Sequence, residues 1–353
     1  MEQAGSGPLA GDQLVGRSGR GSGPERLLFG GDTALCGDEP LSELSGVAES
    51  CCLMINLEAS LDEGRRVEKH VTSVVTPPLL DHLAAFRVVA NIANNHASDD
   101  GNPEHLSQAL RERGVTVLGP ENPARVRIDV AGRIVDLFAA CLRLPRRRMD
   151  YLDGSARQLL AMVAASDANL RIVSLHWGYE HTDIPAPFQR DLAAMLVRAG
   201  ADLLIGHHPH VRQGWEEIDG VPVFYSLGHL NFGLSSRPME SRHRRGILLG
   251  YDPLDRSVEL LPVTLDASHR PSIDCGERRD AALVEIAALS AALDISDGDW
   301  YRQEYGRWFY GELRVWVRRC KQHPFLWAKC FLWLVLPLQF RYYLAVVGGW
   351  LGQ

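Results

Sequence analysis

The sequence predicts an α/β fold, and three features of the 353-residue chain support that prediction. Short apolar runs with the length of buried strands alternate with longer amphipathic segments, which is the pattern of α/β proteins. Many of these apolar runs end in polar residues that are able to do chemistry. The composition, 46% hydrophobic and 23% charged, is that of a globular protein and excludes chain-wide disorder and a disulfide-stapled miniprotein.

Composition divides the chain into three regions. Residues 1–25 contain seven glycines and no charged-then-apolar pattern, so we expect a flexible leader and no signal peptide. Residues 26–270 contain the alternating strands and helices and are expected to form the main domain. Residues 271–353 are predicted to be a helical, basic and aromatic extension. The net charge of −7 argues against nucleic acid as a partner.

In the first half of the main domain, apolar runs that stop at glycine or polar residues predict four strands. These strands span residues 27–29, 51–57, 88–92 and 134–142. A helix is predicted over residues 77–85, where proline occupies the first turn. A second helix is predicted over residues 103–113, because Asn102 can cap its start and Gly114 can end it.

The second half of the domain continues the alternation. Amphipathic segments predict helices over residues 154–165 and 188–199, the latter ended by Gly200. Further strands are predicted at residues 171–175, 203–205, 223–227, 246–251 and 258–265. Beyond Pro271 the pattern becomes helical, with segments over residues 279–293 and 301–322.

Six of the predicted strands end in side chains suited to metal binding. These side chains are Asp32, Glu58, Asn95 with His96, His176, His208 with His210, and His229. In open α/β sheets, ligands bind beyond the carboxyl ends of the strands. Carboxylate, amide oxygen and imidazole are donors for divalent cations, so six such endings together predict one shared site. A single loop histidine, by contrast, is more often solvated or hydrogen-bonded than metal-bound.

The segment Gly206-His207-His208-Pro209-His210 places several imidazoles in one sharp turn. Pro209 restricts the backbone, which favours preorganised donors at His208 and His210. The alternative interpretation is a polar loop in which some histidines cap backbone groups. That alternative is favoured for His207, whose other role would be a substrate contact or an extra ligand.

Several short motifs occur in order along the chain and together suggest a family. They are Gly30-Gly31-Asp32, Asn56-Leu57-Glu58, Asn94-Asn95-His96, His176-Trp177-Gly178, the histidine segment 206–210, and Ser226-Leu227-Gly228. This combination resembles the CapA family of poly-gamma-glutamate capsule synthesis proteins, over about residues 26–250. That family is in turn similar to the calcineurin-like metallophosphoesterases. The resemblance implies a four-layer α/β/β/α sandwich.

The resemblance also implies roles for the residues at the strand ends. The implied metal ligands are Asp32, Glu58 in the bridging position, the amide of Asn95, and the imidazoles of His176, His208 and His210. They would hold one or two divalent ions of the manganese, iron or zinc type, which would activate water and clamp the attacked group. His96 resembles the catalytic histidine, which would protonate a leaving group. Asn94 is a candidate substrate contact or extra ligand.

Glu180 lies four residues beyond His176 and is a second candidate catalytic residue. It would orient a metal ligand or bind a substrate amine, and its alternative role is that of a solvated loop acid.

Departures from the two family patterns bear on the metal site. Position 34 is Ala34, where the phosphoesterase pattern has a histidine two residues after the first aspartate, and Glu58 replaces the bridging aspartate. One metal position is therefore expected to be weak or absent, which puts hydrolysis in doubt. The capsule family has asparagine after Ser-Leu-Gly, where this chain has His229. His229 is either an extra ligand, a substrate contact or an ordinary loop side chain.

The C-terminal segment has a distinct character. Residues 302–353 contain eight Lys or Arg and two Asp or Glu, and residues 300–353 contain six of the eight tryptophans. Interleaved basic and aromatic residues are typical of helices at an anionic membrane surface. We expect a cytoplasmic protein, or one held peripherally at the cytoplasmic membrane by this segment; the alternative is a pair of helices packed on the body. Arg143 and residues 146–148 form another basic cluster, either a polymer contact or a solvated loop.

Three functional hypotheses follow. The leading one is a CapA-like protein with a divalent-metal site that acts in the biosynthesis, export or processing of poly-gamma-glutamate or a related anionic capsule polymer. Its partners would be that polymer, capsule-synthesis subunits and a membrane surface. The second hypothesis is a freestanding metal-dependent hydrolase of a phosphoester or an amide. The third is a non-catalytic capsule assembly factor, so whether the chain is an enzyme is open on sequence alone.

Overall fold

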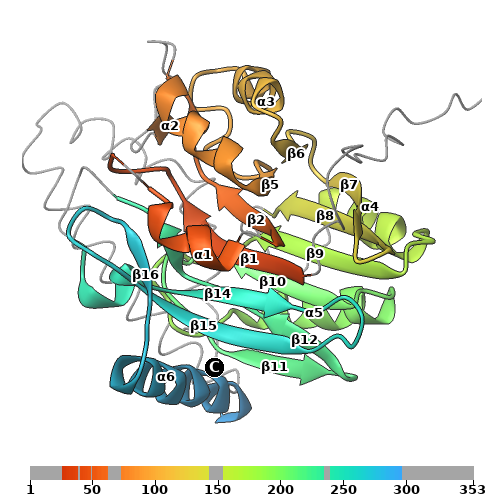
Figure 1. Ribbon diagram of the computed structural model, residues 1–353. Helices are drawn as coiled ribbons and strands as arrows, with labels where there is room; N and C mark the ends of the chain where they lie inside the picture. Colours follow the sequence, from red (N-terminus) through yellow and green to blue (C-terminus); the bar gives the residue numbers. More distant parts are fainter. Residues whose placement is uncertain are drawn as a thin grey trace, which may run out of the picture.

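The computed structural model describes residues 26–38, 40–48, 50–62, 73–142, 154–233 and 239–295. Within these ranges the chain forms two large sheets that stack against each other, with helices on their outer faces (Figure 1). This arrangement confirms the predicted four-layer α/β/β/α sandwich. The predicted leader, the basic cluster around Arg143 and the aromatic segment 302–353 lie outside the described residues.

The first sheet combines a parallel half with an antiparallel half, in the order β16-β15-β14-β1-β2-β5-β6. The parallel strands are β1 (Arg26–Thr33), β2 (Cys51–Leu57), β5 (Arg87–Asn91) and β6 (Thr116–Leu118). The antiparallel strands are β14 (Arg245–Tyr251), β15 (Val258–Leu265) and β16 (Pro271–Ile273). A short strand, β13 (His229–Asn231), pairs in parallel with the carboxyl end of β1.

The second sheet has the order β11-β12-β10-β9-β8-β7. Its four inner strands are parallel: β12 (Val221–Phe224), β10 (Leu203–His207), β9 (Leu170–His176) and β8 (Arg133–Cys141). The edge strands β11 (Trp215–Ile218) and β7 (Ala124–Val130) run antiparallel to their neighbours. The short strands β3 (Ser60–Leu61) and β4 (Val74–Val75) pair in parallel with each other and form hydrogen bonds with neither large sheet.

Helices cover the outer face of each sheet because their apolar sides pack there. The first sheet is covered by α1 (Ser45–Ala48), α2 (Pro77–Asp81) with the 3₁₀ turn His82–Ala85, and α3 (Pro103–Glu112). The second sheet is covered by α4 (Gly154–Ala164) and α5 (Pro187–Arg198). The predicted cap of α3 is present, since the Asn102 side chain accepts a hydrogen bond from the backbone N–H of Glu104 at 3.1 Å.

Three apolar layers hold the sandwich together. Phe29 and Met54 of the first sheet meet Leu137 and Ile172 of the second in the layer between the sheets. The alternate residues of the same strands point outward and form one layer with each set of helices. The central strands are therefore buried on both faces, which explains why they read as continuous apolar runs in the sequence.

The strands and helices missing from the sequence prediction are short or lie at edges. The edge strand β7 alternates arginine with apolar residues, and β11 contains two glutamates, so neither resembles a buried run. β16 adds residues 271–273 to the first sheet, so the sheet continues past the point where we expected the helical extension to begin.

The last described helix, α6 (Glu277–Ile295), was predicted over residues 279–293, and it closes one side of the sandwich. It contacts β15 of the first sheet and β11 of the second, and it lies at the lower edge of the molecule in Figure 1. Its Glu285 carboxylate pairs with Arg212 and Arg245, each at 2.6 Å. Among the described residues, no helix is long and apolar enough to cross a membrane.

Two glycines allow β1, β13 and β14 to approach closely. A Cβ atom on Gly31 would lie 2.0 Å from the carbonyl oxygen of Gly228, and one on Gly246 would lie 1.9 Å from that of His229. The register between β1 and β2 shifts between Phe29 and Asp32, next to the first of these contacts. The glycines therefore fix where the carboxyl end of β1 and the start of β13 lie, and with them the side chains of Asp32 and His229.

Replacing Gly31 with alanine is expected to destabilise the fold by about 3 kcal/mol or more, because the added methyl group can be accommodated only by moving backbone. The matched control is Gly46→Ala in α1, where no atom lies within 4 Å of the new Cβ, and no loss of stability is expected, since alanine in a helix is up to about 1 kcal/mol more favourable than glycine. Thermal and denaturant unfolding would measure both. Equal stabilities for the two variants would contradict the proposed close approach.

Candidate metal centre

Two buried carboxylates form the base of the site. Asp32 lies near the end of β1 and Glu58 directly follows β2, and neither is exposed to solvent. The side-chain amide of Asn56 lies between them and donates to Asp32 Oδ1 and Glu58 Oε1, each at 2.9 Å. Asn56 and Glu58 are two residues apart and share a direction, as alternate positions of extended chain do. Asn56 was not among the predicted site residues.

Three imidazoles from the second sheet face these carboxylates. His176, the last residue of β9, places Nδ1 3.5 Å from Glu58 Oε1. His207, the last residue of β10, places Nδ1 3.4 Å from Asp32 Oδ1. His210 lies 3.2 Å from Asp32 Oδ2 through Nδ1 and 3.7 Å from Glu58 Oε2 through Nε2. The carboxyl ends of strands from both sheets thus meet at one place, as the sequence pattern predicts.

The turn after β10 brings His208 into the same cluster. Its ring lies 4.5 Å from the His176 ring, centroid to centroid, and its backbone N–H points to Asp32 Oδ2 at 3.3 Å. His208 and His210 have positive φ angles of 95° and 58°, which non-glycine residues rarely adopt. This strained turn lets consecutive residues point into one site. His207, for which the role of an ordinary polar-loop residue was favoured, instead contacts Asp32.

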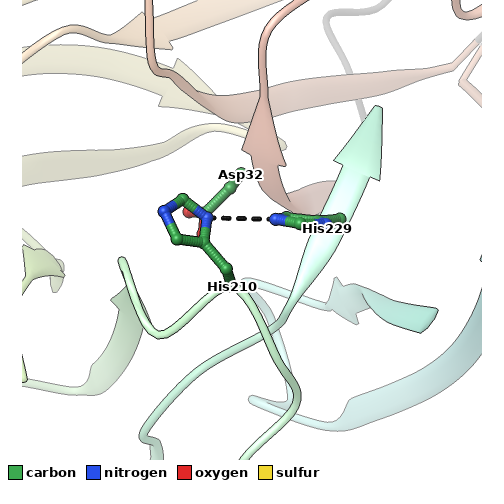
Figure 2. Close-up of side chains that lie close together, drawn as sticks. All are labelled: Asp32, His210 and His229. Atoms are coloured by element: carbon green, nitrogen blue, oxygen red, sulfur yellow. Dashed lines mark hydrogen bonds and ion pairs between the residues drawn. The ribbon is translucent and has the colours of Figure 1, made fainter. Parts of the chain in front are cut away.

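His229 completes a compact group with Asp32 and His210 (Figure 2). Its Nε2 atom lies 3.0 Å from Nδ1 of His210, and its Nδ1 atom lies 2.7 Å from the backbone carbonyl oxygen of His243. The three residues come from β1, the loop after β10, and β13, and each offers a ligand atom within 4.8 Å of the other two. A second such group consists of Glu180, His208 and His210.

The loop after β5 brings one asparagine, Asn94, into the site. Asn94 donates to the Leu57 carbonyl at 2.8 Å and to Asn56 Oδ1 at 3.3 Å. Asn95, the predicted amide ligand, is exposed. Its neighbour Asn94 is the residue that contacts Asn56, the amide between the two carboxylates. The Asn94 side-chain oxygen accepts from the backbone N–H of His96 at 3.0 Å, which fixes the start of the next turn.

His96 lies at the same end of the sandwich and pairs with a buried acid. Its Nδ1 atom lies 2.7 Å from Asp99 Oδ2, and the same oxygen accepts from the backbone N–H of Ser73 at 2.9 Å. Asp99 has no solvent exposure, whereas the His96 side chain is 11% exposed. A buried, hydrogen-bonded acid therefore orients an imidazole that solvent can reach.

Glu180 and two further histidines border the cluster. The Glu180 side chain is 46% exposed and lies 3.6 Å from Nε2 of His181. His181 Nδ1 lies 3.1 Å from His243 Nε2, and both rings are buried. His181 and His243 were missed by the sequence prediction, since one adjoins a loop acid and the other lies in an arginine-rich loop without any motif. The signal for Asn56 was present in Asn56-Leu57-Glu58, but no role was assigned to it.

The two carboxylates respond oppositely to their shared burial. Burial disfavours a charged Asp32, but hydrogen bonds and charge attraction from His207 and His210 outweigh it and hold the pKa of Asp32 well below its usual range. Burial, followed by the neighbouring charge of Asp32, raises the pKa of Glu58 well above its usual range. The pair therefore favours one negative charge over two when no cation is present.

Burial also keeps the imidazoles of His176, His208 and His229 neutral. It lowers the pKa of His208 to about 4 and that of His229 to about 3, and it lowers the pKa of His176 well below the usual value. Neighbouring histidines add to the effect on His176 and His229, because like charges repel. Neutral imidazole is the form that binds metal ions.

The donor set fits a divalent cation. Among the described residues, Glu58 Oε2, His176 Nε2 and His208 Nδ1 are buried and make no hydrogen bond. Buried polar atoms without partners are costly, and three at one site indicate a missing partner with positive charge or protons. Two carboxylates with several imidazoles suit manganese, iron, cobalt or zinc better than magnesium. Which of these residues bind an ion, and how many ions they bind, stay predictions.

Comparison with known proteins shows which proteins the chain resembles. A family model described as bacterial capsule synthesis protein PGA_cap matches residues 9–233. The capsule biosynthesis protein CapA of Bacillus anthracis is 31% identical over 200 residues, which cover 51% of this chain and 47% of that protein. A probable polyglutamine synthesis accessory protein of Mycobacterium tuberculosis is 28% identical over 223 residues, which cover 54% of this chain and 57% of that protein.

The chain spans about half the length of these curated relatives. Among solved structures, a hypothetical protein of Thermus thermophilus has a TM-score of 0.40 at 18% identity, covering 70% of this chain and 95% of that one. A 5'-nucleotidase of Candida albicans also has a TM-score of 0.40, at 10% identity, covering 77% of this chain and 59% of that one.

We expect the metal-free protein to lose stability as the pH falls from 7 toward 4. An unfolded histidine takes up a proton near pH 6.5, whereas buried His208 resists protonation until about pH 4. The free energy of unfolding then falls by on the order of 1 kcal/mol per pH unit for each such histidine. Glu58 acts in the opposite direction, because its raised pKa lets the folded state hold a proton over the same range.

The variant His208→Asn isolates one histidine, and asparagine tolerates the positive φ angle at this position. Its pH dependence of unfolding should be shallower than that of the unaltered protein by about one proton. The control His82→Asn makes the same substitution at a half-buried histidine outside the cluster. Chelator-treated protein in urea at several pH values provides the measurement. Parallel curves for His208→Asn and the unaltered protein would contradict the burial of neutral His208.

Proposed function

The chain belongs to the bacterial capsule synthesis protein family PGA_cap, and from this membership we propose that it acts on poly-gamma-glutamate or a related anionic capsule polymer through a divalent-metal centre. Relatives named for capsule biosynthesis and for PGA biosynthesis, from Bacillus anthracis and Bacillus subtilis, support the polymer class. The observation that supports the chemistry is the meeting of Asp32 and Glu58 with the histidines of β9, β10 and β13 at one end of the sandwich.

A cation would resolve an electrostatic conflict at this site. Asp32 is charged while His176, His208 and His229 are neutral, so without a cation the cluster offers little positive charge to attract a polymer of glutamate. The residues that would hold the ion are Asp32, Glu58, His176, His208 and His210, with Asn94 or Asn95 as the amide candidates. When bound, the ion would supply Lewis-acid polarisation of the bond to be broken.

His96 has the geometry of a proton donor to the leaving group. The Asp99 carboxylate accepts a hydrogen bond from the Nδ1–H of His96, which leaves Nε2 as the ring atom that would exchange a proton with substrate. Asp99 is itself fixed by the Ser73 backbone N–H, so the ring is held in one orientation. A leaving amine, such as the one released from a γ-glutamyl amide, needs such a proton. This arrangement favours a catalytic role over a purely scaffolding one.

The proposal extends to partners and location. Arg143 with residues 146–148, and the basic segment 302–353, are the candidate contacts for an anionic polymer and for the cytoplasmic membrane. Capsule-synthesis subunits are the proposed protein partners. Glu180, near the exposed border of the site, is proposed to bind a substrate amine or to orient a metal ligand.

We predict that His96→Ala lowers the rate of polymer cleavage by about 100-fold or more while the metal is retained, because a general acid contributes that much without binding the ion. Polymer length would be followed by gel electrophoresis, new amino termini by an amine-reactive dye, and metal content by elemental analysis. The matched control is His105→Ala, which removes an imidazole paired with an acid, Asp100, in the adjoining segment.

Other outcomes separate the competing functions. Turnover of a generic phosphodiester that depends on His96, with the polymer left intact, would favour a freestanding phosphoester hydrolase. Capsule formation that persists in the double variant Asp32→Ala, His210→Ala would favour a non-catalytic assembly factor. Loss of the metal together with activity in His96→Ala would contradict the separate role given to this histidine.

A further inference from the structure

We propose that His229 is a direct ligand of a divalent transition-metal ion, which it binds together with Asp32 and His210, and that the backbone of His243 holds its ring in the metal-binding form. The inference rests on the divalent cation of the proposed function, but it concerns a residue that the capsule-family motif does not supply. It assigns to β13 the donor that Ala34, the residue directly after β1, cannot provide.

The backbone brings His229 beside Asp32. β13 runs parallel to β1, and the two residues are direct partners in the register. The backbone N–H of Asp32 donates to the carbonyl of Gly228 at 2.8 Å, and that of Ala34 donates to Asn231 at 2.7 Å. A ring on β13 at this position therefore reaches the same point as a side chain carried by β1 itself.

A bulge in β13 aims the ring. The register moves from Asp32 opposite His229 to Thr33 opposite Asn231, so β13 has one residue more than β1 over this step. Such bulges reorient side chains and are frequent beside active sites. Asn231, just beyond the bulge, anchors the strand by donating to the carbonyls of Cys36, Pro40 and His269 at 2.8–3.1 Å. The position of His229 is thus set on both sides.

The hydrogen bond to His243 determines which ring nitrogen is the donor to metal. A carbonyl oxygen only accepts, so the Nδ1 atom of His229, 2.7 Å away, carries the proton. In the neutral ring, Nε2 then has the lone pair, and it faces Nδ1 of His210 at 3.0 Å. A metal-binding histidine is typically oriented in this way, through a hydrogen bond from its other nitrogen to a carbonyl or carboxylate.

Three atoms converge on one point. Asp32 Oδ2 lies 3.2 Å from His210 Nδ1, which in turn lies 3.0 Å from His229 Nε2, as Figure 2 shows for the three side chains. All three residues are at least 95% buried, so a cation bound here would be largely shielded from bulk water. One carboxylate and two imidazoles form a donor set suited to zinc, iron, cobalt or manganese.

The test measures cobalt(II) binding to the full chain, with no polymer present. We expect His229→Ala to weaken cobalt binding by about 100-fold or more, since loss even of an outer partner of a ligand costs 10–100-fold. The visible absorption of the bound cobalt should change with it. The matched control is His105→Ala, which removes an imidazole paired with Asp100 outside the cluster, and it should bind cobalt within a few-fold of the unaltered protein.

A second measurement does not depend on the folding of a variant. Crystals of the unaltered chain grown with cobalt(II) would locate the ion by anomalous scattering, and we expect it about 2.1 Å from His229 Nε2. An ion bound to Asp32 and His210 but beyond bonding distance of His229 would overturn the inference, as would unchanged affinity in His229→Ala. Either result would leave the proposed function standing if the polymer were still cleaved. Cobalt bound to His229 in a protein inactive on polymer would support this inference and contradict the proposed function.

Discussion

The burial of two carboxylates side by side is the constraint on which the rest of the site depends. Asp32 and Glu58 are removed from water, and such a pair is tolerated only when donors and positive charge surround it. Asn56 satisfies one oxygen of each, and histidines from the opposite sheet approach the others. Because those groups come from both sheets, the site exists only while the two sheets are packed together.

The backbone meets this constraint with unusual local geometry. Gly31 and Gly246 permit contacts that any side chain would block, and His208 and His210 adopt positive φ angles in the turn after β10. Strain of this kind persists where surrounding structure over-determines it, and it concentrates at functional sites. The stability of the sandwich core, built from three apolar layers, is what offsets this local cost.

Much of this arrangement could be predicted from the sequence, for identifiable reasons. The strands that are buried on both faces are continuous apolar runs, so the sequence predicts their positions and the polar residues at their ends. The role of Asn56 could not be predicted, because a buried amide that bridges two acids looks like any polar strand-end residue until its partners are known. The same holds for His181 and His243, which reach the site through long-range packing, and for β13, whose three residues are too few to show periodicity.

The ion pairs of Glu285 have a mechanical consequence. This carboxylate on α6 binds Arg212, two residues after His210, and Arg245, two residues after His243. The helix from which the chain continues beyond Ile295 is therefore tethered to both histidine-bearing loops. A displacement of α6 would therefore reach the backbone on both sides of the site through this one carboxylate, which couples the last described helix to the geometry around Asp32.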